Sequence, residues 1–167
     1  MAASAVASGL VAGLEAKVKE LEEALAGVTD QEASRPIDGD WSINHILSHL
    51  LGHDDKRLVE RLQTFVDKDM PEVDVAVNDA VYTPARQKMT YAELHRAVLT
   101  QYQDMAAFLG SCTDEQLERR GHIPEFFKDT PLTATPTLSL WATGLTQFHL
   151  AGHIQQIREH RSRQPAW

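Results

Sequence analysis

The chain has 167 residues, 43% of them hydrophobic and 24% charged, which suits one globular domain and argues against disorder. Its formal net charge of −8 disfavours a general binder of nucleic acids or anionic membranes, because phosphate groups attract basic surfaces. The single cysteine, Cys112, excludes an intramolecular disulfide, and no stretch approaches the roughly 20 apolar residues of a membrane span. We therefore expect one cytoplasmic domain over residues 1–167, with neither nucleic acid nor membrane as a partner.

Two amphipathic helices are expected in the first part of the chain. Apolar residues at spacings of three and four place one stripe along residues 10–28. A loop rich in Asp, Pro and Gly follows, and Asp40 or Ser42 can cap a second helix that runs to about Val66. The candidate core residues of this second helix are Ile46, Leu50, Leu58, Leu62 and Phe65.

Two more helices are expected in the rest of the chain, separated by long loops. The connection 67–89 contains two prolines and leads to Thr90-Tyr91-Ala92-Glu93, whose spacing is that of a capping box at the start of a helix through about Leu109. Residues 113–116 repeat this spacing and predict a short helical turn. After the loop 121–136, the last helix is expected from about Thr137 to His160.

Four long helices without a convincing strand pattern predict an all-α fold, a four-helix bundle. The connection 67–89 is much longer than the roughly 2–8 residues that join adjacent antiparallel helices. We therefore expect a crossover connection in the bundle.

Five of the eight histidines stand at four-residue spacing on the second and last predicted helices. His149 and His153 stand four residues apart on one helix face, where two imidazoles can bind one ion at about 2.0–2.1 Å. His45, His49 and His53 repeat this spacing, but each step of four advances about 40° around the helix axis. At most one or two of these three therefore reach the ion bound by the pair. A three-histidine set leaves an open coordination position, as catalytic zinc sites do.

The other histidines and the cysteine have less specific surroundings. Ala151 and Gly152, between the paired histidines, leave room for a neighbouring helix. Cys112 has no basic partner nearby in sequence, so we expect it to be structural or incidental. Three histidines without a partner at ligand spacing are expected to be surface or hydrogen-bonded residues: His95, His122 and His160.

Two segments resemble the motifs of the DinB/YfiT-like family, whose members are assigned as metalloenzymes. Trp41-Ser42 stands where the second helix begins, and Trp41 precedes His49 by eight residues, as in the family's first motif. The pair His149 and His153, with the polar Gln156 three positions on, is similar to the second motif. The order of the predicted elements fits the family over nearly the whole chain.

This resemblance implies a four-helix bundle with a crossover, often a homodimer, that holds a divalent metal through His49, His149 and His153. Imidazole ligands suit Zn or Ni, with Fe and Mn as alternatives. His53 and Asp54 are candidates for supporting the ligands or lining the pocket.

The two tryptophans near the predicted site have different expected roles. Trp41 is expected to anchor the core where the second helix begins, rather than to contact substrate. Trp141 can serve either the core or the substrate. The two long loops are expected to determine substrate choice, and their candidate pocket residues are Tyr82, Arg86, Phe126 and Phe127.

A three-histidine site predicts a metal-dependent enzyme that acts on a small molecule by hydrolysis or by thiol transfer. Thiol transfer is implied by relatives that use bacillithiol or mycothiol, so a low-molecular-weight thiol is a candidate second cofactor. One alternative is a metal- or small-molecule-binding stress or sequestration protein without turnover. Another is a structural bundle whose histidines are vestigial.

Overall fold

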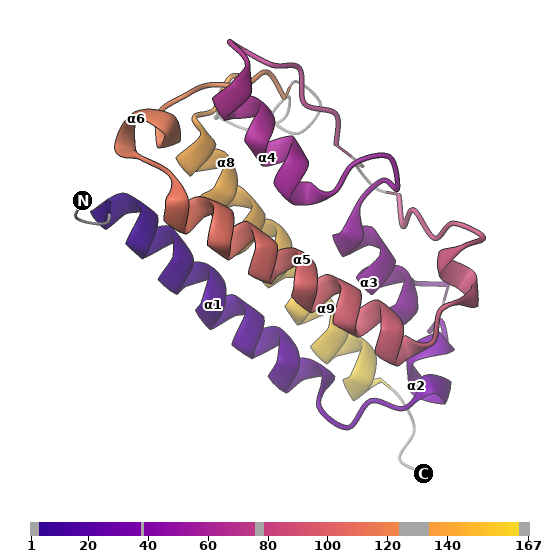
Figure 1. The fold of residues 1–167 in the computed structure, drawn as a ribbon. Coiled ribbons are helices and arrows are strands. Elements are labelled where there is room, and N and C mark those ends of the chain that lie inside the picture. Colours follow the sequence, from indigo (N-terminus) through magenta and orange to yellow (C-terminus); the bar gives the residue numbers. More distant parts are fainter. Residues whose placement is uncertain (1–3, 38, 76–78, 124–133, 164–167) are drawn as a thin grey trace.

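The computed structural model describes residues 4–37, 39–75, 79–123 and 134–163 (Figure 1). Its elements are α1 (Ala5–Leu25), α2 (Asp30–Ser34), α3 (Ile43–Leu51), α4 (Leu58–Asp67), the 3-10 turn η1 (Arg86–Lys88), α5 (Tyr91–Ser111), α6 (Asp114–Leu117), α8 (Leu138–Gly144), the π-helical segment η2 (Leu145–Leu150) and α9 (Ala151–Ser162). None of these helices combines the length and the apolar character needed to cross a bilayer.

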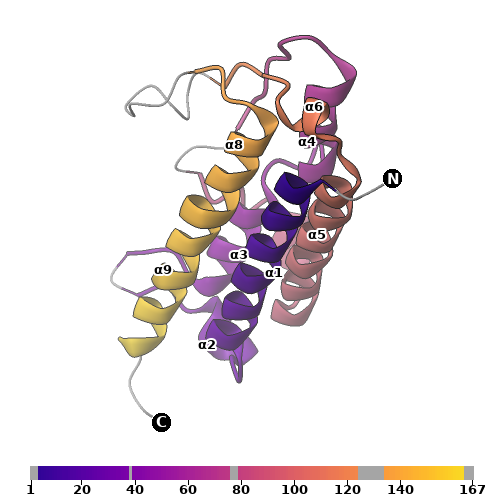
Figure 2. The same cartoon turned by 90° about the vertical axis from the view of Figure 1, so that its left-hand side faces the viewer.

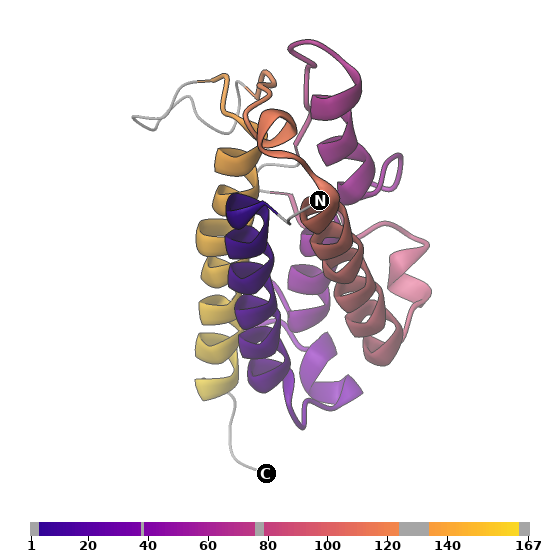
Figure 3. The same ribbon diagram turned by 60° about the vertical axis from the view of Figure 1, so that its left-hand side comes forward.

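Four helical rods form the bundle: α1, α3, α5 and the continuous rod α8–η2–α9. Helix α1 packs against α5 and α9, and α3 packs against the same two helices, so α1 and α3 lie on a diagonal. Figures 2 and 3 show α1 and the α8–α9 rod running in one direction and α3 and α5 in the other. The link between α4 and α5 must therefore travel back along the bundle, which explains its length. The predicted four-helix bundle with a crossover is confirmed.

Helix α1 carries the predicted apolar stripe but has different ends. Leu14, Leu21 and Leu25 are buried in the core, as the periodicity requires. The helix begins at Ala5 because the Ser4 hydroxyl caps it by accepting a hydrogen bond from the backbone N–H of Ala7. It ends at Leu25 rather than Val28, since Gly27 adopts a φ of +72° that a right-handed helix does not contain.

The predicted caps of the later helices are confirmed. Thr90 and Glu93 form a reciprocal capping box at the start of α5, and Thr113 and Gln116 form another at α6. The loop predicted before Trp41 instead contains the short helix α2, whose cap is Thr29 with a 3.2 Å hydrogen bond from the Glu32 amide. The capping spacing was therefore present in a segment assigned to a loop.

The prediction of one continuous second helix from Ser42 to Val66 is wrong. Its first half, α3, ends at Leu51, and its second half, α4, begins at Leu58. Gly52 adopts a φ of +71°, and its N–H closes the helix on the His49 carbonyl at 2.9 Å. Gly52, with two aspartates after the intervening His53, is the sequence signal for this break.

The last rod is continuous, as predicted, but it contains the π-helical segment η2. The residues that this segment buries are Leu145, Thr146 and Leu150. The same segment leaves Phe148 on the outside, with 72% of its surface exposed. Short π-helical insertions occur often at functional sites, and this one contains His149.

Candidate metal centre

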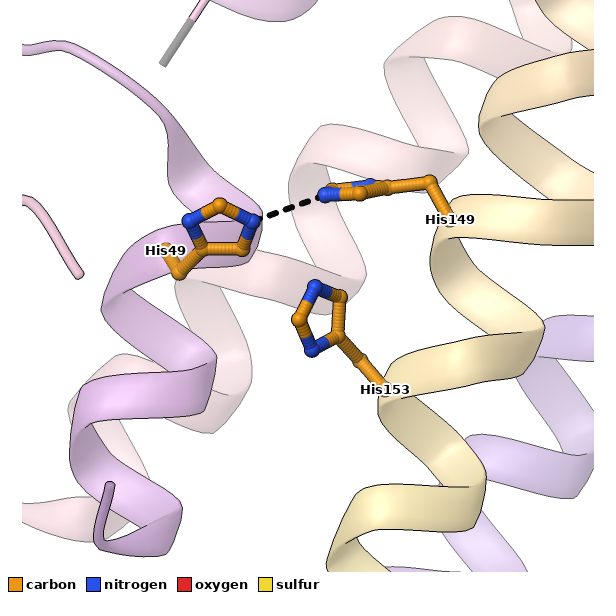
Figure 4. A group of neighbouring side chains, drawn as sticks. All are labelled: His49, His149 and His153. Atoms are coloured by element: carbon orange, nitrogen blue, oxygen red, sulfur yellow. Dashed lines mark hydrogen bonds between the residues drawn. The ribbon is translucent and has the colours of Figure 1, made fainter. Parts of the chain in front are cut away.

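The structure brings the three predicted ligands together between α3 and the last rod (Figure 4). His49 lies in the last turn of α3, His149 in η2, and His153 in the first turn of α9. Nε2 of His49 is 2.8 Å from Nε2 of His149, and the ring of His153 lies 4.7 Å from both other rings, measured between centroids. One nitrogen from each ring lies within 4.8 Å of the other two.

Two of the three imidazoles are oriented by a hydrogen bond from the nitrogen that faces away from the cluster. Nδ1 of His49 donates to the Asp79 carbonyl at 2.6 Å, and Nδ1 of His153 donates to Oε1 of Gln156 at 2.8 Å. These bonds select the tautomer in which Nε2 carries a free lone pair. They are the usual outer contacts of metal-binding histidines.

Burial favours the neutral form of two of the three imidazoles, His149 and His153. It lowers the pKa of His149 to about 3, with the neighbouring imidazoles of His153 and His49 acting in the same direction. It also lowers the pKa of His153, although the hydrogen bond with Gln156 opposes this shift. Neutral imidazole is the form that binds metal ions, so the lowered pKa values of His149 and His153 favour metal binding.

This donor set fits a divalent transition metal. Three imidazole nitrogens within 4.8 Å of one another can converge on one ion at about 2.0–2.1 Å after small side-chain rotations. No carboxylate joins them within the described part of the chain. Three protein ligands leave a coordination position for water or substrate, which separates catalytic from closed structural sites.

A buried arginine fixes α3 at the end that carries His49. Nη1 of Arg86 donates to the carbonyls of Ser48 and Gly52 at 2.8 and 2.7 Å, and its Nη2 pairs with Asp54 at 2.6 Å. Only 8% of Arg86 is exposed. The guanidinium therefore satisfies carbonyls that the end of α3 leaves without helical partners.

The loop that supports His49 is held in a strained conformation. Val81 has a φ of +46°, which is unfavourable for a β-branched residue. Its carbonyl accepts a 2.8 Å hydrogen bond from the Ser48 hydroxyl, and its N–H donates to Oδ1 of Asp79 at 2.8 Å. These bonds fix the turn that presents the Asp79 carbonyl to His49, which is where such strain is tolerated.

The three histidines line a cavity of about 280 Å³. Trp41 packs against the core, as predicted, but it also forms part of the cavity wall, with its ring 5.0 Å from that of His49 and 6.3 Å from that of His153. Trp141 is buried and borders the cavity too. The other residues of the described lining are Leu50, Leu51, Gly52, His53, Leu58, Arg61, Asp74, Val75, Tyr102 and Leu145.

The candidates for supporting residues are placed differently from the prediction. His53 lies in the break after α3 and lines the cavity, whereas Asp54 pairs with Arg86, which in turn holds the end of α3. The groups that hold the ligands directly are the Asp79 carbonyl and Gln156. Sequence reasoning noted Gln156, but no sequence signal identifies a backbone carbonyl from a distant loop.

Several predicted pocket residues lie elsewhere. Tyr82 packs its ring 4.5 Å from His45, whose Nδ1 is 2.6 Å from the Ser42 hydroxyl, and neither ring joins the ligand cluster. Arg86 pins α3 rather than lining the cavity. Gly152 is exposed, with no heavy atom within 4 Å of the position its Cβ would take, so the predicted close helix approach is wrong. The remaining two candidates, Phe126 and Phe127, lie outside the described residues.

The histidines predicted to lie outside the site do so. Nδ1 of His122 is 2.6 Å from Oε1 of Glu72, and Nε2 of the buried His160 is 2.9 Å from the Arg35 carbonyl. His95 stacks beside Tyr91 on α5. Cys112 is buried, its thiol donates to the Phe108 carbonyl, and burial raises its pKa, which disfavours the reactive thiolate. 

Comparisons with known proteins agree with this arrangement. The family model of the DinB superfamily matches residues 14–157. Among solved structures, the chain is similar to YfiT from Bacillus subtilis, "a probable metal-dependent hydrolase with an unusual four-helix bundle topology", with a TM-score of 0.74. The two share 21% sequence identity over 94% of this chain and 86% of that one, which establishes a common fold. No curated protein matches the chain.

Proposed function

The chain belongs to the DinB superfamily, and from this premise we propose that it is a metal-dependent hydrolase that acts on a small molecule. The proposed ligands of the metal are His49, His149 and His153. The observation that carries the proposal is the convergence of three imidazoles in the lining of a mostly apolar cavity. When bound there, a divalent ion supplies Lewis acidity and activates water for attack at neutral pH.

The protein's own contribution is to hold the ligands and to exclude bulk water. The Asp79 carbonyl and Gln156 keep two of the ring nitrogens facing the cluster. The apolar walls, which include Trp141 and Leu145, lower the local dielectric and strengthen electrostatic interactions with a bound substrate.

The cavity volume favours hydrolysis over thiol transfer. A cavity of about 280 Å³ is at the lower limit of the roughly 300–1,000 Å³ typical of pockets for drug-sized ligands. Thiol transfer requires that a cofactor such as bacillithiol and an electrophile occupy the site together. Hydrolysis requires one small substrate and water.

Three further properties belong to the same proposal. We propose Zn or Ni as the ion, because both accept three imidazole nitrogens readily. A homodimer and a cytoplasmic location follow from the resemblance and the composition. Sedimentation velocity of the purified chain measures the first, and cell fractionation measures the second.

The test is a hydrolysis screen on protein purified without a histidine tag. The protein is stripped with a chelator, reloaded with Zn or Ni, and assayed with small uncharged esters, lactones and amides. We expect turnover that requires the metal, is lost in His153→Ala, and persists in the control His122→Ala, which removes a histidine far from the cluster.

A second arm of the screen adds a low-molecular-weight thiol and an electrophile. Turnover only in this arm would replace hydrolysis by thiol transfer. Metal binding without turnover in either arm would contradict the enzymatic proposal and leave a binding protein.

A further inference from the structure

Tyr102, on α5, is a buried residue of the described cavity lining that carries a polar group. Only 2% of its surface is exposed, and burial raises the pKa of its phenol, which keeps the group protonated. Within the described residues its hydroxyl forms no hydrogen bond with the protein. A buried donor without a partner is costly, so such a group is commonly matched by water or a ligand.

Another tyrosine on the same helix shows the contrast. The Tyr91 hydroxyl is also buried, but it donates to the Leu25 carbonyl at 3.2 Å and serves the packing of α5 on α1. Asn44 Oδ1 and His95 Nε2 also lack hydrogen-bond partners, yet neither residue lines the cavity. Among these groups, the unpaired phenol of Tyr102 is the one placed to meet a molecule in the cavity.

The charged residues of the described lining do not select for a charged ligand. Nη1 of Arg61 donates to the Asp74 carbonyl at 2.8 Å, and its Nη2 pairs with the Asp55 carboxylate at 2.8 Å. The side chain of Arg61 is 13% exposed and its charge is thereby compensated. Asp74 adds one negative charge at the same side of the cavity, and most other walls are leucine, valine and tryptophan.

We propose that Tyr102 is the hydrogen-bond donor that selects the substrate, and that the substrate is a small, uncharged, mainly apolar molecule with an acceptor oxygen. An ester, lactone, amide or ketone oxygen meets this description. The inference rests on the proposed function, since it concerns the same cavity. A site with a buried donor discriminates strongly against analogues that lack the acceptor, because the donor is then left unpaired.

The test uses two probes that differ in one carbonyl group, acetophenone and ethylbenzene. A cavity of roughly 150 Å³ accepts benzene, so both probes are small enough for this one. Their dissociation constants are measured on the full chain, metal-free and zinc-loaded. The variant is Tyr102→Phe, and the matched control is Tyr91→Phe, which removes a hydroxyl from the same helix outside the cavity.

In Tyr102→Phe we expect acetophenone to bind about ten-fold more weakly relative to ethylbenzene, the usual effect of one lost hydrogen bond. Tyr91→Phe leaves this ratio unchanged. The carbonyl stretching band of bound acetophenone shifts to higher frequency in Tyr102→Phe, which a merely structural tyrosine would not cause. In the absence of probe, the Tm falls in Tyr91→Phe and not in Tyr102→Phe, because only Tyr91 has a partner to lose.

An affinity ratio and a carbonyl frequency that are the same in wild type and Tyr102→Phe would overturn the proposal, as would the absence of binding by either probe. Tyr102 also borders a surface groove between α1 and α5. NMR spectra recorded with and without probe distinguish the two places. Resonance shifts at Ala106 alone would place the probe in the groove and overturn the proposal, whereas shifts at Leu145 would support it. The metal-free measurement separates this test from the hydrolase proposal, which can fail while the Tyr102 effect persists.

Discussion

The two sides of the bundle are built differently. On the side of α1 and α5, two 21-residue helices run without interruption and meet through an apolar interface. On the side of α3 and α9, the helix breaks at Gly52, the last rod contains a π-helical segment, and Val81 adopts a strained backbone conformation. All three candidate ligands lie on the second side.

This difference separates the parts that stabilise the fold from the parts that position the site. The regular side follows the local rules of helix formation, so its contribution is burial of apolar surface. The irregular side departs from these rules where a ligand or its supporting group must be placed. Departures of this kind are expected at functional sites. Mutations on the two sides should therefore have separable effects on stability and on metal binding.

The largest expected effect is on the regular side. Leu21→Ala removes a fully buried side chain of α1 and should lower the free energy of unfolding by about 2–5 kcal/mol. Because Leu21 is not part of the cluster, the affinity of the folded protein for metal should stay unchanged. Urea unfolding and a metal titration measure the two quantities, and Leu140→Ala, at a 38% exposed position, is the mild control. A loss of metal affinity in Leu21→Ala would show that stability and metal binding are not separable between the two sides.

The second expected effect is on both the free energy of unfolding and the affinity for metal. Arg86→Met keeps much of the side-chain volume but leaves the carbonyls of Ser48 and Gly52 unpaired, which should cost about 2–3 kcal/mol of unfolding free energy. Metal affinity should also fall, since these contacts hold α3 beside the Asp79 loop. The control Arg57→Met removes an arginine whose side chain is 66% exposed and should change stability by less than about 1 kcal/mol. Equal changes in stability and metal affinity in the two variants would show that the contacts of Arg86 do not hold α3 in place.

A smaller effect should appear in metal binding alone. Gln156→Leu removes the acceptor that orients His153 and should weaken metal binding by about 10–100-fold. The matched control, Gln155→Leu, changes the neighbouring exposed glutamine, which contacts Glu159 instead. Calorimetric titration with zinc compares the two variants. Similar affinities for both would mean that Gln156 does not orient the ligand.

The smallest effect is the pH dependence of the metal-free protein. Folding lowers the pKa of His149 from 6.5 to about 3, so above pH 6.5 neither state binds the proton. Between pH 6.5 and 3 the unfolded state binds it and the folded state does not, and stability falls by about 1.4 kcal/mol per pH unit as the pH decreases. Urea unfolding at pH 7.5, 6.5 and 5.5 should show a steeper loss in wild type than in His149→Ala. Parallel curves would contradict the burial of a neutral His149.

Local sequence patterns predicted the regular side well. Apolar spacing located α1, and the capping residues Thr90 and Thr113 located the starts of α5 and α6. The pair His149 and His153 stood out because four-residue spacing places two side chains on one helix face. The resemblance to the DinB/YfiT-like family then singled out His49 among the three histidines of the second predicted helix.

The irregular features resisted prediction for physical reasons. The break at Gly52 required a choice between helix propensity and a left-handed glycine, and the apolar period continued on both sides of it. The π-helical segment depends on packing of the last rod against its neighbours. The Asp79 carbonyl is a backbone group whose position depends on Val81 and Arg86, contacts between distant segments that no local pattern encodes.

The proposed function depends on the binding of one divalent ion by the three histidines. The most direct measurement is elemental analysis of tag-free protein after incubation with Zn or Ni and removal of excess metal, since a histidine tag can itself bind nickel. We expect about one ion per chain in wild type and in His122→Ala, and none in His149→Ala, whose helicity should stay intact. No bound metal in wild type, or undiminished metal in His149→Ala, would contradict it.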